Sequence, residues 1–207
     1  GSIPSTTIVA DTGHFSVGTY TGNGTDNSTV GHGLGGVPET IIVRNLSRST
    51  FGLVWNTDVG GATHCADFAV AAAFSANSAK FGGSDETAPT SSVFKIGTHN
   101  EINASGESLV FYALRSIPGV CKVGNYIPNN VVNGPYVSLG FTPAYLLIKC
   151  IATTNPWIVF DNTRGPTNPV TKYLLASSNA AEGSSGRDID FINDGFKIRE
   201  DDSDTNG

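Results

Sequence analysis

The chain repeats five short segments in the same order, at a spacing of roughly 105 residues. The first set reads FSVGTY at 15–20, VPETIIVR at 37–44, LVWN at 53–56, FSANSA at 74–79 and VFKIG at 93–97. The second set reads CKVGNY at 121–126, TPAYLLIK at 142–149, IVFD at 158–161, ASSNAA at 176–181 and GFKIR at 195–199. Self-similarity at a fixed spacing constrains architecture more than any single motif does. The sequence therefore predicts two copies of one domain.

Short apolar or alternating segments, bounded by Gly, Pro, Asn or Asp, occur throughout both copies. Such spacing with turn residues between the segments is typical of β-sandwiches and barrels. We therefore expect an all-β fold: two tandem antiparallel β-sandwich domains, jelly-roll-like, derived from an internal duplication. Residues 62–80 are rich in alanine and are compatible with a helix, a buried strand or an irregular excursion.

The predicted domain limits are 13–117 and 118–207, with residues 1–12 forming a cloning remnant and an N-terminal strand. The opening Gly-Ser and the lack of Met are typical of a recombinant fragment. The first copy continues into SLVFYAL at 108–114, a predicted strand that the second copy does not reach. We expect the second copy to lack its last strand. Its partner would be Thr6–Ala10, the same segment of a neighbouring subunit, or, as favoured, residues that follow this sequence.

The matched apolar positions are the predicted cores of the two domains, because each recurs in both copies. They are Val17, Ile41, Val43, Trp55, Phe94, Val123, Leu146, Ile148, Phe160 and Phe196. Three cysteines without metal-type spacing are expected to be free thiols, with Cys121 and Cys150 as small buried side chains. The four histidines show no zinc-site spacing and are expected to be structural.

Composition bounds the partners of the chain. Its net charge is −6 and only 14% of residues are charged, against about 25% in typical domains. A phosphate-backbone partner needs clustered Lys and Arg, so we expect no nucleic acid. No apolar stretch approaches the ~18–20 residues that span a bilayer, so we expect no membrane insertion.

The C-terminal segment offers a candidate metal site. Asp202, Asp204 and Asn206 follow the D-x-D-x-N-G opening of a calcium loop, whose carboxylate and amide oxygens bind the ion. The alternative is a solvated acidic turn before a hairpin strand. Apart from calcium at these residues, we expect no cofactor.

Three aromatic residues offer a candidate ligand site. Tyr136, Tyr145 and Trp157 are compatible with a platform on which sugar rings stack, but aromatic residues in strands are more often part of the core.

Acid–base chemistry on a glycosidic bond needs two facing carboxylates. Asp188 and Asp190 would share one face of a strand and Asp85 lies in a loop with Glu86, but the sequence shows no facing partner for either pair. It has no nucleophile elbow, P-loop or dinucleotide fingerprint. We expect no enzyme and no catalytic residue. Asp161 and Arg164 are expected to lock a turn by pairing with each other.

The second copy carries a recognisable pattern, from Leu139–Pro143 and Leu147–Lys149 through Trp157–Asp161 and Arg164–Gly165 to Asp194–Ile198. The first copy keeps Gly18–Gly24 and Phe94–Ile96 but lacks the Arg-Gly pair. This pattern resembles a repeat domain of unassigned function in virion and tail-associated proteins of tailed bacteriophages, many of them marine or environmental.

The resemblance implies a virion location and a structural or tail-fibre-associated function, with contact to the host surface as a further role. Partners would be other virion proteins and a host cell-surface glycan, and a homo-oligomer is compatible with it. Two alternatives stay open: a carbohydrate-binding module of a secreted or surface protein, and a virion-borne polysaccharide depolymerase.

Overall fold

The computed structural model describes residues 1–9, 13–49 and 52–207. The protein is all-β, with antiparallel sheets and one short helix, α1 (Asn100–Asn103). The chain divides into two compact units: unit 1 comprises Gly1–Phe68 and Phe74–Ile117, and unit 2 comprises Ala69–Ala73 and Pro118–Gly207. The main division falls between Ile117 and Pro118, and unit 2 also takes in Ala69–Ala73.

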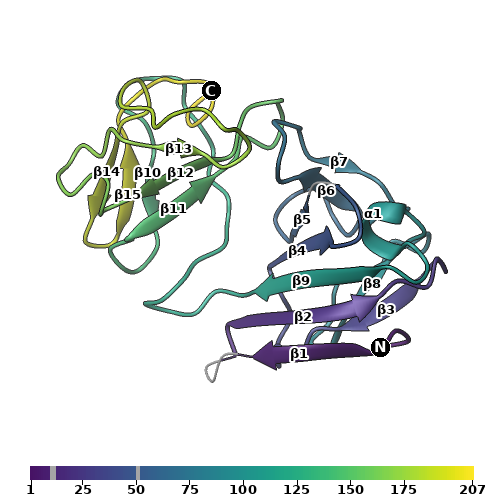
Figure 1. Ribbon diagram of the computed structural model, residues 1–207. Coiled ribbons are helices and arrows are strands. Elements are labelled where there is room, and N and C mark those ends of the chain that lie inside the picture. Colours follow the sequence, from purple (N-terminus) through teal and green to yellow (C-terminus); the bar gives the residue numbers. More distant parts are fainter. Residues whose placement is uncertain (10–12, 50–51) are drawn as a thin grey trace. The chain divides into compact units, whose positions relative to one another are not determined.

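Unit 1 contains a seven-stranded antiparallel sheet, in the order β1-β2-β9-β4-β5-β6-β7 (Figure 1). Its strands are β1 (Ser5–Val9), β2 (Phe15–Thr21), β4 (Thr40–Asn45), β5 (Leu53–Asn56), β6 (His64–Asp67), β7 (Ser75–Ala76) and β9 (Ser108–Leu114). A second sheet pairs β3 (Ser28–Gly31) with β8 (Val93–Ile96). Residues 62–80, ambiguous in the sequence, thus contain two strands.

The strand β9 lies between β2 and β4, and all seven of its residues pair with β2. Its core-facing side chains are Leu109, Phe111 and Ala113, each 0% exposed. Gly18 on β2 makes room for one of them, because a Cβ at Gly18 would lie 2.5 Å from the Phe111 ring. Sequence-distant strands therefore fit together through one glycine–aromatic contact.

Burial along β2 corrects one predicted core position. Ser16, Gly18 and Tyr20 face the core, whereas Val17 is only half-buried. Side chains alternate between the two faces of a strand, so Val17 lies on the opposite face, paired with Tyr112 of β9. The predicted core residues Ile41, Val43, Trp55 and Phe94 are confirmed, at 3% exposure or less.

Unit 2 is built from two three-stranded antiparallel sheets among the residues that the structure describes, β10-β15-β14 and β11-β12-β13. The strands are β10 (Tyr136–Ser138), β11 (Tyr145–Ile148), β12 (Ile158–Asp161), β13 (Leu174–Leu175), β14 (Ile189–Ile192) and β15 (Gly195–Ile198). Its buried core contains Ile148, Ile158, Phe160, Val170, Ile189, Phe196 and Ile198. The prediction is thereby confirmed for Ile148, Phe160 and Phe196, but Leu146 and Val123 are half-buried.

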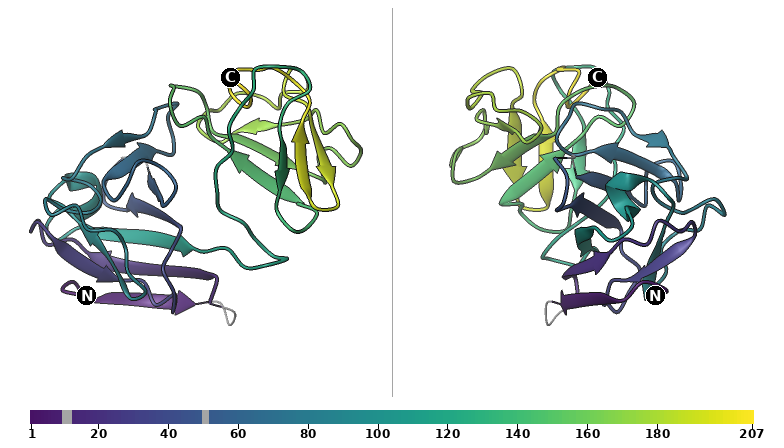
Figure 2. Two further views of the ribbon diagram at one scale, coloured as in Figure 1. Left: turned by 180° about the vertical axis from the view of Figure 1, so that it is seen from behind. Right: turned by 45° about the vertical axis from the view of Figure 1, so that its right-hand side comes forward.

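Two further expectations and one of the alternatives need correction. The segment 121–126, expected to be a strand as the counterpart of FSVGTY at 15–20, is coil from residue 122 onward, and Figure 2 shows this teal part of the chain without an arrow. The N-terminal strand Ser5–Val9 pairs with β2 of unit 1, so this segment of the chain does not complete unit 2; Ala10 lies outside the described residues. None of the three cysteines forms a disulfide; Cys65 is buried, and Cys121 and Cys150 are half-buried rather than buried.

His32, which follows β3, is fully buried. The hydrogen bonds of its ring are those of an uncharged imidazole. Its Nδ1 accepts from the Leu34 N–H at 3.2 Å, and its Nε2 lies 3.1 Å from the Thr90 carbonyl oxygen. Since Nδ1 accepts, the single ring proton sits on Nε2 and is donated to Thr90. Burial lowers the pKa of His32 below its ordinary value of 6.5, against the opposing effect of the Thr90 hydrogen bond.

We predict that replacing His32 by Gln flattens the pH dependence of stability on the acid side. Because the pKa of His32 is lower in the folded chain, the unfolded chain binds the proton first as the pH falls below about 6.5. The free energy of unfolding of the wild type then falls, by at most about 1.4 kcal/mol per pH unit. Urea denaturation at several pH values between about 7.5 and about 5 measures the difference between wild type and H32Q. Parallel curves for the two proteins would contradict the assignment.

Candidate functional site

The three aromatic residues proposed as a sugar platform do not share an exposed face. Trp157, just before β12, is only 5% exposed. Tyr145 begins β11 and is 57% exposed, whereas Tyr136 lies on β10 in the other sheet of unit 2 and donates its hydroxyl proton to Asp194 at 2.5 Å. Because Trp157 is buried, its ring offers no open face for stacking, as the core alternative anticipated.

The acidic C-terminal turn is organised around Arg187. Its guanidinium lies 3.3 Å from Asp202, forms a short ion pair with Asp204, and donates to the Tyr173 hydroxyl at 2.5 Å. The same group lies over the Tyr173 ring, 4.7 Å from its centroid. Burial disfavours the charge of Arg187, but the hydrogen bond to Asp204 and the two carboxylate charges outweigh it and raise its pKa.

Asn206, the third predicted calcium ligand, serves a different purpose. Its fully buried side chain accepts a hydrogen bond from Asn129 N–H at 2.9 Å and donates to the carbonyl oxygens of Val131 and Glu200 at 2.8 and 2.9 Å. The predicted ligands Asp202 and Asp204 therefore meet at a guanidinium, while the Asn206 amide binds backbone groups. Among residues 1–9, 13–49 and 52–207, no group of three or more His, Cys, Asp or Glu is placed to hold a metal ion.

Of the candidate acid–base residues Asp188 and Asp190, the carboxylate of Asp190 forms an ion pair, whereas one carboxylate oxygen of Asp188 is buried without a hydrogen-bond partner. Asp190 on β14 is 8% exposed and pairs with Arg199, at 2.5 Å from its Nε. The neighbouring Asp188 is half-buried, and its backbone oxygen accepts from Arg199 N–H at 2.8 Å.

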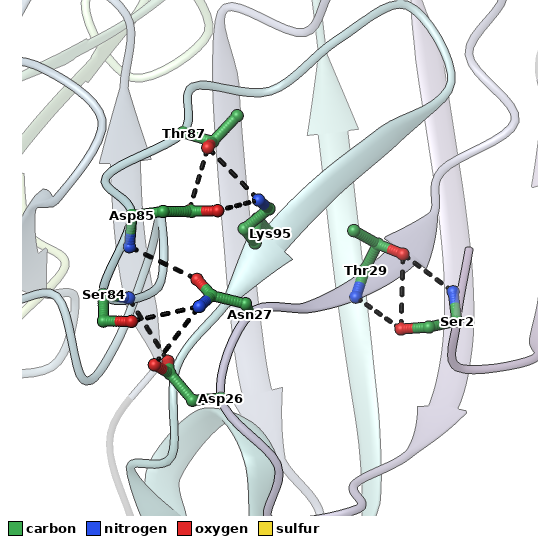
Figure 3. Close-up of polar contacts among 8 residues, drawn as sticks. All are labelled: Ser2, Asp26, Asn27, Thr29, Ser84, Asp85, Thr87 and Lys95. Carbon is green, nitrogen blue, oxygen red and sulfur yellow. Dashed lines mark hydrogen bonds and ion pairs between the residues drawn. The ribbon is translucent and has the colours of Figure 1, made fainter.

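Asp85 belongs to an exposed polar network of unit 1 (Figure 3). It accepts from Lys95 at 2.5 Å and from Thr87 at 2.9 Å, and these bonds lower its pKa. Nearby, Asn27 donates to the Ser84 hydroxyl at 3.0 Å, while Asp26 accepts from the Ser84 N–H. The network ties the turn before β3 to the loop at 82–87. A carboxylate held as an anion in this way is poorly suited to donate a proton.

The turn after β12 is closed as its sequence indicated. Asp161 accepts from the backbone N–H groups of Thr163 and Arg164 at 3.0 and 2.7 Å, and from Arg164 Nε at 2.8 Å. These backbone and side-chain bonds lower the pKa of Asp161.

The feature that sequence reasoning located only indirectly is the free edge of β11. Among the described strands, β11 pairs with β12 and is the outer strand of its sheet. Asn162 N–H donates to the Ala144 oxygen, so in the alternation of an antiparallel ladder the backbone groups of Leu146 and Ile148 point toward β12. Those of Tyr145 and Leu147 consequently point away from β12, along the edge.

Side chains beside this edge are apolar and incompletely covered. Tyr145 and Leu147 are 57% and 37% exposed, Ile151 is 40% exposed, and the core-facing Leu146 is half-buried. An apolar edge strand is a site for pairing with another strand. The β11 edge is thus an incompletely covered apolar edge of unit 2.

Together these placements define an all-β chain of two units whose candidate ligand and acid–base side chains are largely used in turns, ion pairs and cores. Within the described residues, no helix is long and apolar enough to cross a membrane. The model of a family described as a domain of unknown function, DUF7483, matches residues 1–207, and the chain belongs to that family. No curated protein and no solved structure matches the chain.

We predict that Arg187→Gln destabilises unit 2, because it leaves the carboxylates of Asp202 and Asp204 without their shared cation. Hydrogen bonds to charged groups contribute about 1.5–3 kcal/mol each, so the free energy of unfolding should fall by about that amount. Lys172→Gln is the matched control, since Lys172 and Glu182 form an exposed ion pair, of a kind worth about 0–1 kcal/mol. Millimolar calcium should leave the wild-type Tm unchanged. A calcium-dependent rise in Tm would show that the turn binds the ion in spite of Arg187.

Proposed function

We propose that this chain is a structural, tail-associated module of a bacteriophage virion, built from two copies of one β-sandwich domain. The observation that carries the proposal is a set of equivalent backbone contacts in the two units. The virion setting comes from the sequence pattern shared with tail-associated proteins.

The first equivalence is a strand register. In unit 1, β4 and β5 pair Thr40 with Asn56 and Val43 with Leu53. In unit 2, β11 and β12 pair residues 105 positions later in each case: Tyr145 with Asp161 and Ile148 with Ile158. The turn that follows is also alike, since Asn56 accepts from Asp58 N–H at 2.9 Å as Asp161 accepts from Thr163 N–H.

The second equivalence lies in the other sheets. Phe94 of β8 pairs with Val30 of β3, and Phe196 of β15 pairs with Val137 of β10. The opposite side of each central strand is also alike: Ile96 bridges to Phe81, as Ile198 pairs with Ile189.

The third equivalence is a buried asparagine that binds backbone groups of corresponding segments in each unit. Asn103 accepts from Asn23 N–H at 2.9 Å and donates to the oxygens of Thr25 and Gly97 at 2.9 and 2.7 Å. Asn206 makes the same three bonds to Asn129, Val131 and Glu200. We call each of these residues the asparagine clamp of its unit.

The turn that leads into each clamp matches as well. His99 caps α1 by accepting from Glu101 N–H, and its oxygen accepts from Ile102 and Asn103 N–H. Asp202 accepts from Asp204 N–H, and its oxygen accepts from Thr205 and Asn206 N–H. The D-x-D-x-N-G segment thus corresponds to a capping turn of unit 1. This correspondence supports the alternative that the motif forms a turn rather than a calcium site.

The two units share features of their backbone scaffold, namely the strand registers, the asparagine clamps and the capping turns. Their polar clusters differ, since the exposed Asp85 network belongs to unit 1 and the largely buried Arg187 cluster to unit 2. A repeated scaffold with unlike surfaces is suited to assembly and surface contact, which favours a structural protein.

We predict that Asn103→Ala and Asn206→Ala destabilise their own units to a similar degree. Each replacement leaves buried backbone groups unsatisfied, at about 1–3 kcal/mol per group, so each loss should be at least about 2 kcal/mol. Hydrogen exchange of the amides in each unit measures the local free energy of opening, and the exposed Asn179→Ala is the control. If one clamp variant is neutral while the other is not, the two clamps are not equivalent and the duplication proposal fails.

Immunogold labelling tests the virion assignment. An antibody raised against the chain should decorate particles of a phage that encodes it, at one repeated place along the tail. Particles that stay unlabelled, with the protein in the soluble fraction of the lysate, would overturn the assignment. Binding of the isolated chain to host glycans without labelling of particles would favour a carbohydrate-binding module instead.

A further inference from the structure

We propose that Asn133 is a modification site, at which the asparagine side chain closes a succinimide with Gly134 and is converted to aspartate or isoaspartate. The sequence contains three Asn-Gly steps, which begin at Asn23, Asn133 and Asn206. Glycine after asparagine favours the reaction, because it has no Cβ to hinder the approach of the side-chain carbonyl carbon to the backbone nitrogen. The structure distinguishes the three steps and leaves one of them able to react.

The reaction uses groups of the chain itself and water. The backbone nitrogen of the glycine loses its proton to solvent and bonds to Cγ of the asparagine, while the Cγ–Nδ2 bond breaks and ammonia leaves. Water that attacks Cγ of the resulting imide gives aspartate. Water that attacks the backbone carbonyl carbon gives isoaspartate, in which the main chain runs through Cβ and Cγ. A hydrogen bond that holds the asparagine amide or the glycine N–H must therefore open before the imide can form.

The step at Asn23 is held closed by hydrogen bonds. Its Oδ1 accepts from the Thr25 N–H at 2.9 Å and from the Ser28 hydroxyl at 3.0 Å. The N–H of Gly24, which contains the attacking nitrogen, donates to the backbone oxygen of Asn103 at 2.9 Å. Both reacting groups of this step are therefore restrained.

The step at Asn206 is restrained by burial and by the clamp. The side chain is 0% exposed and is bound to Asn129, Val131 and Glu200. Its amide cannot turn toward the nitrogen of Gly207 without losing these bonds inside the unit. Leaving buried polar groups unpaired is costly, so this step is expected to stay intact in the folded chain.

The step at Asn133 has none of these restraints. Asn133 is exposed and lies in a bend shortly before β10. Within the part of the chain that the structure describes, its side-chain amide makes no hydrogen bond, and neither does the N–H of Gly134. Asn133 contributes only its backbone oxygen, which accepts from Asn129 Nδ2 at 3.3 Å. The side chain is therefore free to approach the nitrogen of Gly134.

The modified step lies beside the asparagine clamp of unit 2. A Cβ on Gly134 would lie 2.9 Å from Ile198 Cβ and 3.0 Å from the amide nitrogen of Asn206, so the glycine packs closely against both residues. Its oxygen accepts from Lys197 Nζ at 2.6 Å. Aspartate at position 133 adds a negative charge next to these contacts, and isoaspartate also lengthens the main chain that leads into them. Modification is therefore expected to loosen the packing around the clamp of unit 2.

Peptide mapping of the full chain by mass spectrometry, with an isoaspartate-specific methyltransferase as the detector, tests the site. The folded chain is incubated at a mildly alkaline pH, which assists loss of the glycine N–H proton. The peptide that contains Asn133 should acquire aspartate and isoaspartate at least about tenfold faster than the peptide that contains Asn23, because the hydrogen bonds of Asn23 must open first. In concentrated urea, where folding protects neither step, the two rates should become similar.

Asn133→Gln is the matched variant. It keeps an exposed amide at this position, but its longer side chain would have to close a larger and less favourable ring. Conversion at position 133 should be lost in this variant, whereas the slow conversion at Asn23 should be unchanged. After incubation, hydrogen exchange should become faster at the amides of Ile198 and Asn206 in the wild type and stay unchanged in the variant. The comparison with urea uses only wild-type protein and does not depend on how the variant folds.

Two outcomes would overturn the proposal: Asn133 that stays intact in the folded chain over a period in which it converts in urea, or equal conversion rates of Asn23 and Asn133 in the folded chain. Conversion of Asn133 without faster exchange in unit 2 would confirm the site but contradict its expected effect on the clamp. The reaction depends on neither the duplication nor the virion setting, so its absence would leave both of those proposals standing.

Discussion

The sheet of unit 1 depends on the insertion of β9 between β2 and β4. This strand comes last in the unit, yet it joins the β1–β2 hairpin to the β4–β7 strands, which pair with each other only through it among the described residues. Its three inward side chains are completely buried. Because antiparallel pairing and burial are satisfied on both sides at once, the register of the whole sheet follows from one strand.

Local sequence patterns were sufficient to predict most of the strands and most of the core residues. Alternation and turn residues located the strands around Ile41, Phe94, Phe160 and Phe196, because these features are local. Patterns could not determine which face of β2 is buried, since Gly18 faces inward only because Phe111 arrives from a distant strand. The same limit applies to 121–126, whose composition favours a strand although pairing requires a neighbour that no local pattern supplies.

The candidate sites illustrate a different limit. Carboxylates at alternate positions before Asn-Gly suit calcium ligation and turn capping equally well, because both use oxygen acceptors aimed at one point. The deciding group, Arg187, lies outside the motif and was not singled out by spacing. Likewise, Trp157 is a residue type that suits a ligand platform, but its burial depends on packing that the sequence does not specify. The β11 edge was approached from the sequence by comparing the two copies, which is a comparison of architecture rather than of motifs.

Both asparagine clamps bind only backbone atoms. The positions they hold carry unrelated side chains: Thr25 in one unit and Val131 in the other, Gly97 in one and Glu200 in the other. A bond to a backbone oxygen is indifferent to the side chain attached beside it. The loops that these two asparagines fix can therefore change their side chains while keeping the same backbone course.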